Sequence, residues 1–332
     1  MRILVTGGAG FIGSHLAEAL LDRGDEVWAL DDLSTGRLEN LRTFAHHPRF
    51  HFHEGSVLDG ATVRQLVAMC DCVFHLAAAV GVKFVLDNPL RSIRTNIFGT
   101  ETVLECCARR RCRVVLFSSS EVYGKGTAIP FAEDDDRLMG PTYKLRWSYA
   151  YSKAVDECLA LAHWHQHQLP VTVVRCFNTC GPRQTGAYGM VIPSMVLRAL
   201  RGEPILVHGD GQQSRCFSAV SDVVRGTLLL ADCEAAAGEI FNIGSDEEIA
   251  IAELAERVRA MCGRTSPIEH VPYDRVYGRS FEDLRRRVPD LAKIRRFVGY
   301  RPTVNLDELI AAVVRDARRE MERPVPQGFA TA

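Results

Sequence analysis

The first fourteen residues, MRILVTGGAGFIGS, constrain the fold more than any other part of this 332-residue chain. The apolar run at residues 3–5 is typical of a buried parallel strand, and residues 12–23 have the apolar periodicity of a helix. Three glycines lie between them at a Gly-x-x-Gly-x-x-Gly spacing: Gly7, Gly10 and Gly13. A strand, a glycine turn and a helix start in this order predict an α/β protein. Its first loop can bind a pyrophosphate, because bare backbone allows close approach and the helix N-terminus offers free N–H groups.

The second predicted strand, residues 26–31, ends in an acid, Asp31. It lies roughly twenty residues after the loop, where a carboxylate can bind the adenosine ribose hydroxyls of a dinucleotide. Its charge would repel a 2′-phosphate, so NAD is favoured, although Arg37 leaves NADP as an alternative. We expect the rest of the cofactor site from residues near the strand ends and on the long helix predicted at about residues 88–111: Phe11, Ile12, Asp32, Ala77, Ala78, Asn96 and Ser118.

The chain is too long to fold around a single small core, so we expect one large α/β domain and a smaller lobe. Residues 1–178 predict a doubly wound parallel sheet that binds the dinucleotide. Residues 179–325 contain shorter predicted segments and are interpreted as a smaller, mixed α/β substrate lobe. Some of these segments could return to the main sheet.

Composition excludes several classes of protein. The formal net charge of −1 gives no electrostatic case for binding nucleic acid or an anionic membrane. No apolar run is long enough to span a bilayer, and the first strand begins where a signal peptide would be expected. Eleven scattered cysteines suit reduced thiols and a cytoplasmic location. The histidine clusters lack further ligands, so we expect no metal.

Tyr149 and Lys153 are four residues apart on a predicted helix, residues 149–167, so their side chains share one face. A tyrosine titrates at about pH 10, but a nearby ammonium and a positive nicotinamide both favour the phenolate. Tyr149 could therefore act as a base near neutral pH. Ser119, at the end of the fifth predicted strand, could hydrogen-bond the same substrate hydroxyl and relay its proton.

The glycine loop, Asp31, Ser119 and the Tyr149-x-x-x-Lys153 pair together resemble the extended short-chain dehydrogenase/reductase family. The resemblance covers residues 2 to about 319. It implies a Rossmann-type sheet and nucleotide-sugar chemistry with a bound NAD that is reduced and reoxidised in each turnover. It also implies a homodimer packed through two helices, here residues 89–110 and 149–167. Ser56 departs from the pattern, because many members have an aspartate there, near the adenine.

Further stretches resemble the UDP-glucuronate decarboxylases of this family: SSEVYG at 119–124, GP at 140–141, RWSY at 146–149 and RCF at 215–217. The resemblance implies that Tyr149 deprotonates the C4 hydroxyl while hydride passes to NAD. The resulting 4-ketone lets CO₂ leave, and the returned hydride gives UDP-xylose. Arg215 would stabilise or protonate the enolate, and Glu121 would position the ring or a water.

The same resemblance suggests substrate contacts. Asn178 and Arg215 would bind the diphosphate, and His208 would stack on uracil. Arg183 could pair with a substrate carboxylate, or could have a structural role in a tight loop. The other candidates are Ser120, beside the catalytic serine, and Arg279, for a phosphate. Residues 285–287, three arginines, are interpreted as a solvated helix end.

Three alternatives to a decarboxylase differ from it in the residues that they need. A 4,6-dehydratase needs an acid at position 120, which Ser120 cannot supply. A 4-epimerase of a UDP-hexose or UDP-glucuronate remains open, because it needs only Ser119, Tyr149 and Lys153. A non-catalytic dinucleotide sensor would be expected to lack part of this intact set.

Overall fold

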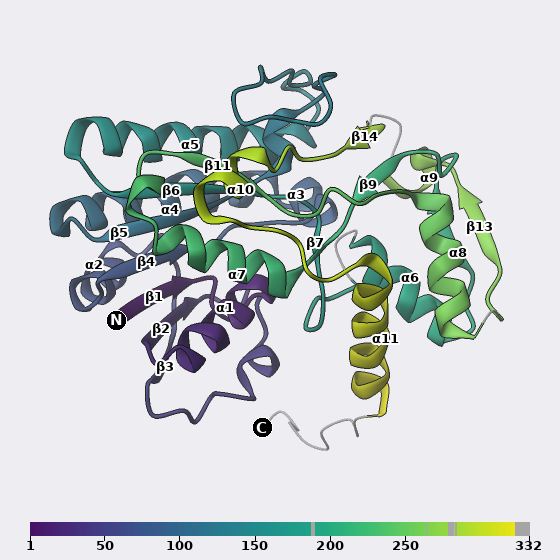
Figure 1. Cartoon of the computed structure of the whole chain (residues 1–332), viewed down its shortest axis with the longest axis horizontal. Coiled ribbons are helices and arrows are strands. Elements are labelled where there is room, and N and C mark those ends of the chain that lie inside the picture. Colours follow the sequence, from purple (N-terminus) through teal and green to yellow (C-terminus); the bar gives the residue numbers. More distant parts are fainter. Residues whose placement is uncertain (187–189, 264, 278–281, 283, 323–332) are drawn as a thin grey trace.

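A seven-stranded parallel sheet forms the centre of the computed structural model, which describes residues 1–186, 190–263, 265–277, 282 and 284–322 (Figure 1). The strand order is β11-β6-β5-β4-β1-β2-β3, and every neighbouring pair is parallel. The strands are β1 (Arg2–Thr6), β2 (Glu26–Asp31), β3 (Phe50–Glu54), β4 (Cys72–His75), β5 (Arg113–Ser119), β6 (Val171–Cys176) and β11 (Ile240–Ile243). The predicted Rossmann-type doubly wound sheet is confirmed.

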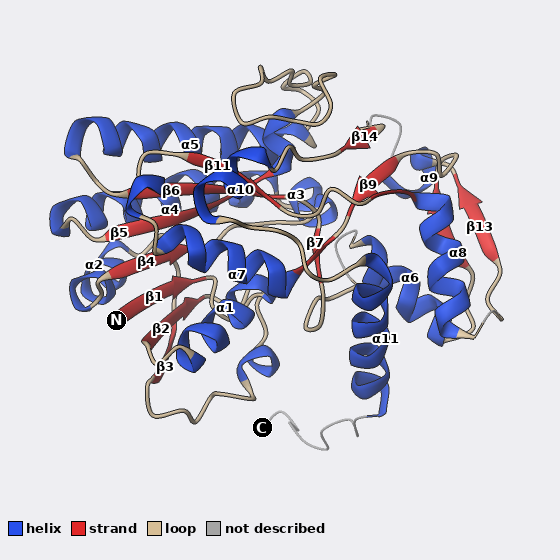
Figure 2. Cartoon of the chain, viewed as in Figure 1, coloured by secondary structure: helices blue, strands red, loops and turns tan. Residues whose placement is uncertain are grey.

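Helices cover both faces of this sheet (Figure 2). Alternate residues of β1 point to opposite faces, so Ile3 packs in one core cluster and Leu4 in another. On the first face lie α1 (Phe11–Asp22), α7 (Val220–Ala231) and α10 (Ala292–Val298). On the second face lie α2 (Gly60–Met69), α4 (Pro89–Arg110) and α5 (Trp147–His167). Because both faces are buried, the central strands are continuously apolar.

The C-terminal half contributes to two regions. Strand β11 joins the main sheet and α7 and α10 cover it, so residues 179–325 do not form a contiguous lobe. A separate core is built from α6 (Val191–Leu200), α8 (Ile251–Cys262) and α11 (Leu306–Glu322) with β8 (Ile205–His208). The remaining elements are β7 (Thr179–Cys180), β9 (Ser214–Cys216), β10 (Ser218–Ala219), β12 (Glu248–Ala250), β13 (Ile268–Val271), β14 (Arg286–Arg287), α3 (Val82–Asp87), α9 (Tyr273–Tyr277) and the 3₁₀ helices η1 (Leu38–Leu41), η2 (Ser120–Tyr123) and η3 (Glu234–Ala236). Among the described helices, none has the length and apolar character needed to cross a bilayer.

A buried ion-pair network ties α5 to the sheet. The Glu157 carboxylate accepts two hydrogen bonds from Arg175 on β6, both 2.9 Å long. It also accepts one of 2.5 Å from the Ser118 hydroxyl on β5 and pairs with Arg137 at 2.7 Å. The Glu157 and Arg175 side chains are 1% and 0% exposed. This network fixes α5 relative to the ends of β5 and β6.

Replacing Glu157 with Gln should lower the free energy of unfolding by about 3–5 kcal/mol, because the Arg175 charge would be buried without its partner. Urea denaturation measures this change. The matched control is Glu105→Gln on α4, which disturbs only an exposed pair with Arg109 and should change stability by less than about 0.5 kcal/mol. Equal effects of the two variants would contradict the structural role of the network.

Candidate active site

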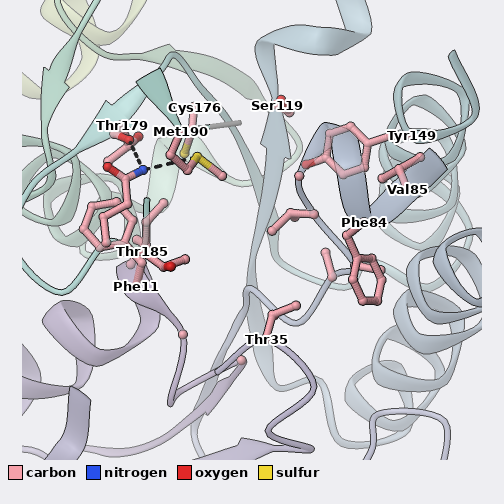
Figure 3. A pocket seen from close by; sticks show the side chains of 18 of the residues that line it. Phe11, Thr35, Phe84, Val85, Ser119, Tyr149, Cys176, Thr179, Thr185 and Met190 are labelled. Carbon is pink, nitrogen blue, oxygen red and sulfur yellow. Dashed lines mark hydrogen bonds between the residues drawn. The ribbon is translucent and has the colours of Figure 1, made fainter. Parts of the chain in front are cut away.

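One cavity of about 590 Å³ joins the carboxyl edge of the sheet to the second core. The chain crosses from one side of the sheet to the other between β1 and β4, where open α/β sheets bind ligands. Figure 3 shows Tyr149 and Phe84 on one side of the cavity and Thr179, Thr185 and Met190 on the other. The cavity therefore brings together residues from both predicted parts of the chain.

The glycine loop is closely packed at one end of this cavity. Gly7 has a positive φ of 71°, and a Cβ there would lie 2.8 Å from the backbone nitrogen of Ala77. A Cβ on Gly13 would collide with the carbonyl oxygen of Gly7. The spacing of the glycines thus leaves bare backbone where a phosphate can approach the start of α1.

Asp31 lies beside the loop, at the end of β2, and is 8% exposed. One carboxylate oxygen accepts a 3.0 Å bond from the Ala9 N–H, and the other a 2.8 Å bond from the Leu33 N–H. Burial raises the pKa of Asp31, and these backbone donors oppose the rise. The Gly10 N–H is a third donor, so at least one of the four lone pairs of the two oxygens stays open to a ribose hydroxyl. The loop and this acid therefore fit the adenosine diphosphate part of a dinucleotide.

Most of the predicted cofactor residues line the cavity: Gly7, Gly10, Phe11, Ile12, Gly13, Asp31, Asp32, Ala77, Ala78, Ser118 and Tyr149. Asn96 and Lys153 lie behind its wall. The Asn96 side chain accepts from the Ala79 N–H at 2.8 Å and donates to the Ser152 hydroxyl at 2.9 Å. Asn96 thus links α4 to α5 and to the loop after β4. Its contact with a cofactor stays a prediction.

Tyr149 and Ser119 meet in the cavity wall. Burial raises the pKa of the Tyr149 phenol above its usual value, and the nearby Glu121 charge raises it further. A hydrogen bond with Ser119 acts in the opposite direction. We expected the Lys153 ammonium to lower this pKa. Instead its Nζ is paired with the Asp156 carboxylate at 2.8 Å. Burial and the charges of Glu121 and Asp156 therefore set the direction of the Tyr149 pKa shift, which is upward.

A group of arginines surrounds Glu121 on η2. Its two oxygens lie 3.3 Å from Arg146 and 2.7 Å from Arg287. Burial alone would raise the pKa of this carboxyl, but the guanidinium groups of Arg287, Arg146 and Arg215 lower it to about 2. Glu121 is therefore ionised at neutral pH and accepts hydrogen bonds rather than donating a proton.

Arg146 and Arg287 were not among the predicted site residues. The interpretation of residues 285–287 as a solvated helix end is wrong for Arg287, which lies on β14 and is 8% exposed at its side chain. Arg146 could have been found, because it lies three residues before Tyr149 and therefore on the same side of α5. Arg287 has no such local signal, since only the tertiary fold brings it to Glu121.

The predicted substrate residues that the structure describes line the same cavity as the glycine loop. Asn178 donates to the Cys216 carbonyl at 2.8 Å, and the His208 ring packs edge-on against Tyr273, a lining residue that sequence reasoning missed. Arg215 donates to the Ser214 carbonyl at 2.8 Å and lines the cavity. Ser120 also lines it, within 3.5 Å of Arg287.

Arg183 lines the cavity, but its guanidinium pairs with Glu18 on α1 at 2.5 Å and contacts Thr43 at 3.3 Å. This arrangement favours the structural alternative for Arg183, and a pairing with a substrate carboxylate stays a prediction. Arg279 lies outside the described residues. In the described part of the chain, no group of three or more His, Cys, Asp or Glu side chains is arranged to hold a metal ion.

The parallel sheet, the glycine loop with Asp31, and the Ser119–Tyr149 pair in the same cavity define the class of a dinucleotide-dependent α/β enzyme. The sequence profile described as GDP-mannose 4,6 dehydratase matches residues 4–313, and the chain belongs to this family of extended short-chain dehydrogenases/reductases. It is 44% identical over 308 residues to a UDP-N-acetyl-alpha-D-glucosaminuronate decarboxylase of Bacillus cytotoxicus, covering 92% of this chain and 94% of that protein. It is 34% identical over 321 residues to UDP-glucuronic acid decarboxylase 1 of Danio rerio, covering 97% and 73%.

Solved structures give the same family. The UDP-glucose 4-epimerase of Thermotoga maritima, solved with UDP-glucose, has a TM-score of 0.88 and 30% identity, covering 97% of this chain and all of that one. The UDP-glucuronic acid 4-epimerase of Bacillus cereus, solved with UDP-glucuronic acid and NAD, has a TM-score of 0.87 and 27% identity, covering 96% and 100%. The comparisons therefore include both decarboxylases and epimerases.

Replacing Gly13 with Ala should weaken NAD binding at least about tenfold, or about 1.4 kcal/mol, because the new methyl group would push the loop away from the Gly7 carbonyl. Calorimetric titration of the purified, cofactor-depleted protein measures this. Gly60→Ala is the matched control, since the nearest atom to its Cβ would be 3.8 Å away. If both variants bind NAD like the parent, the loop is not the phosphate site.

Proposed function

We propose that this protein is an NAD-dependent decarboxylase of a UDP-linked uronic acid and acts by transient oxidation at C4. UDP-glucuronate, which would give UDP-xylose, is the substrate that we expect. The observation that carries the proposal is the ionised Glu121 between Arg146 and Arg287, in the same cavity as Ser119 and Tyr149. Guanidinium groups in this position suit a substrate with carboxylate and phosphate charges.

The residues of the chain then have distinct tasks. Bound NAD supplies the hydride acceptor and a positive ring that favours the phenolate. The glycine loop and Asp31 hold its adenosine and phosphates. Tyr149 takes the proton of the C4 hydroxyl, and its hydrogen bond with Ser119 orients the phenol toward that oxygen. These groups also stay close to the C4 oxygen when it becomes a ketone.

Decarboxylation follows from the position of that ketone. The uronic acid is now a β-keto acid, so the electrons of the breaking bond to CO₂ move toward the C4 oxygen. Arg215 stabilises the enolate charge, and the Tyr149–Ser119 pair holds its oxygen. C5 takes a proton from a water positioned by Glu121 or from Arg215, which is reprotonated by solvent. When C4 regains its hydride, Tyr149 returns the first proton to the C4 oxygen. Glu121 orients the arginines and can accept a hydrogen bond from the sugar.

A second substrate is favoured by one comparison. The relative with 44% identity is named for a 2-acetamido uronic acid, whereas the UDP-glucuronic acid decarboxylases have 33–35% identity. UDP-N-acetylglucosaminuronate is therefore the alternative substrate for the same reaction. A 4-epimerase is the alternative activity, supported by the epimerase structures and by the shared Ser119, Tyr149 and Lys153 set. The intact set argues against a non-catalytic sensor.

We also propose a cytoplasmic homodimer. Helices α4 and α5 pack side by side, and their outer surface exposes large apolar side chains: Leu90, Phe98 and Val155. These helices correspond to the pair through which the family often dimerises. The eleven thiols are free in the structure, as expected for a reducing compartment.

The NAD-loaded protein should convert UDP-glucuronate or UDP-N-acetylglucosaminuronate to a product lighter by one CO₂, identified by mass and NMR. Glu121→Gln should lower kcat at least about tenfold, because the arginines lose the charge that orients them. Glu282→Gln is the control: Glu282 pairs with two lysines but does not line the cavity, so kcat should stay within about twofold. A product of unchanged mass and inverted C4 would instead show an epimerase.

A further inference from the structure

A buried carboxylate, which the proposed mechanism does not use, lies next to the catalytic pair. Asp156 is three residues after Lys153 on α5, and its Oδ2 accepts a 2.8 Å hydrogen bond from the Lys153 ammonium. The two side chains are 0% and 3% exposed. Because both side chains are buried, each of these charges depends on the other for its stabilisation.

Two other ionisable side chains near this pair, His75 and Cys176, carry no charge at physiological pH. His75 on β4 contacts the hydroxyls of Thr6 at 2.7 Å and Thr100 at 3.0 Å. Burial and the Lys153 charge lower the pKa of His75 to about 3, so it is neutral at physiological pH. Burial raises the pKa of the Cys176 thiol on β6 to about 12, so it is neutral too.

The other acidic side chains nearby form ion pairs with arginines rather than with Lys153. Glu157, the next residue on α5, is paired with Arg175 and Arg137. Glu121 on η2 is paired with Arg146 and Arg287. On α4 the neighbour of Asp156 is the Thr100 hydroxyl, which carries no charge. Among the described residues, Asp156 is thus the carboxylate that faces the Lys153 ammonium directly.

We infer that Asp156 is a positioning residue of the active site, which anchors the Lys153 ammonium and offsets part of its positive charge one helical turn from Tyr149. The inference rests on the proposed use of Tyr149 as the base. This role would account for a buried carboxylate at position 156. Tyr149 must take a proton from the C4 hydroxyl, and the negative charge of Asp156 helps to keep the phenolate basic enough to do so.

The sign of the effect follows from charge alone. Burial and Glu121 raise the pKa of Tyr149 most, and the Asp156 charge raises it as well. Removing one negative charge favours proton loss from the Lys153–Tyr149 pair, whichever of the two residues carries the proton. A neutral residue at position 156 should therefore make the base available at lower pH.

The test is Asp156→Asn, which keeps an oxygen for Lys153 but removes the charge. The acid limb of the kcat/KM profile should move to lower pH by at least about one unit, because at an effective dielectric of about 20 a unit charge changes a pKa by about one unit even from roughly 12 Å away. An ultraviolet difference titration of the NAD-loaded protein against its Tyr149→Phe counterpart should shift the phenolate transition in the same direction. Glu105→Gln, an exposed acid on α4, should move neither.

A residue that only stabilises helix packing would lower the melting temperature and kcat but leave both titrations in place, and that result would overturn the inference. If Asp156→Asn does not fold, Asp156→Ser removes the same charge and leaves room for a water beside the ammonium. The phenolate titration needs no substrate. A protein that makes no CO₂ but shows the shift would therefore refute the decarboxylase proposal and leave the role of Asp156 supported.

Discussion

The Glu157 carboxylate is the contact on which the geometry of the site depends most. It joins the Ser118 hydroxyl at the end of β5 and the Arg175 guanidinium on β6 to the helix that carries Tyr149. Parallel strands end at one edge of the sheet, so these contacts place Ser119 and the phenol together although residues 120–146 separate β5 from α5 in the sequence. The catalytic hydroxyls are thus held by rigid elements rather than by flexible ones.

Around this frame the chain arranges its charges in two separate groups. At Tyr149, the Lys153 ammonium is balanced by the buried Asp156. At the sugar end, the ionised Glu121 holds Arg146 and Arg287. In the proposed reaction the first group would tune proton transfer at C4, and the second would orient the guanidinium groups toward the anionic substrate. Because an epimerase needs only Ser119, Tyr149 and Lys153, the second group is the feature on which the decarboxylase proposal rests.

Much of this could be predicted from the sequence, because the signals are local. The glycine spacing, the acid after β2 and the Tyr149–Lys153 spacing each report on one turn or one helix face. Most strands of the main sheet are predicted by short apolar or alternating runs, whereas the return of β11 to that sheet stays open from the sequence. The contribution of Arg287 could not be predicted, because only the tertiary fold brings β14 to η2. The partner of Lys153 was overlooked although Asp156 lies on the same helix, because spacing alone does not tell whether an acid is buried. Likewise, Arg183 carries the charge expected of a substrate ligand, yet its position beside Glu18 depends on how α1 packs against the loop after β7.

The central claim is that Tyr149 and the bound dinucleotide oxidise the substrate at C4 and then restore it. The most direct measurement is turnover of UDP-glucuronate carrying deuterium at C4. The account predicts that the deuterium is retained at C4 of the product, because the same hydride leaves and returns within one turnover. Replacement of that deuterium by solvent hydrogen, in a product that has lost CO₂, would contradict it.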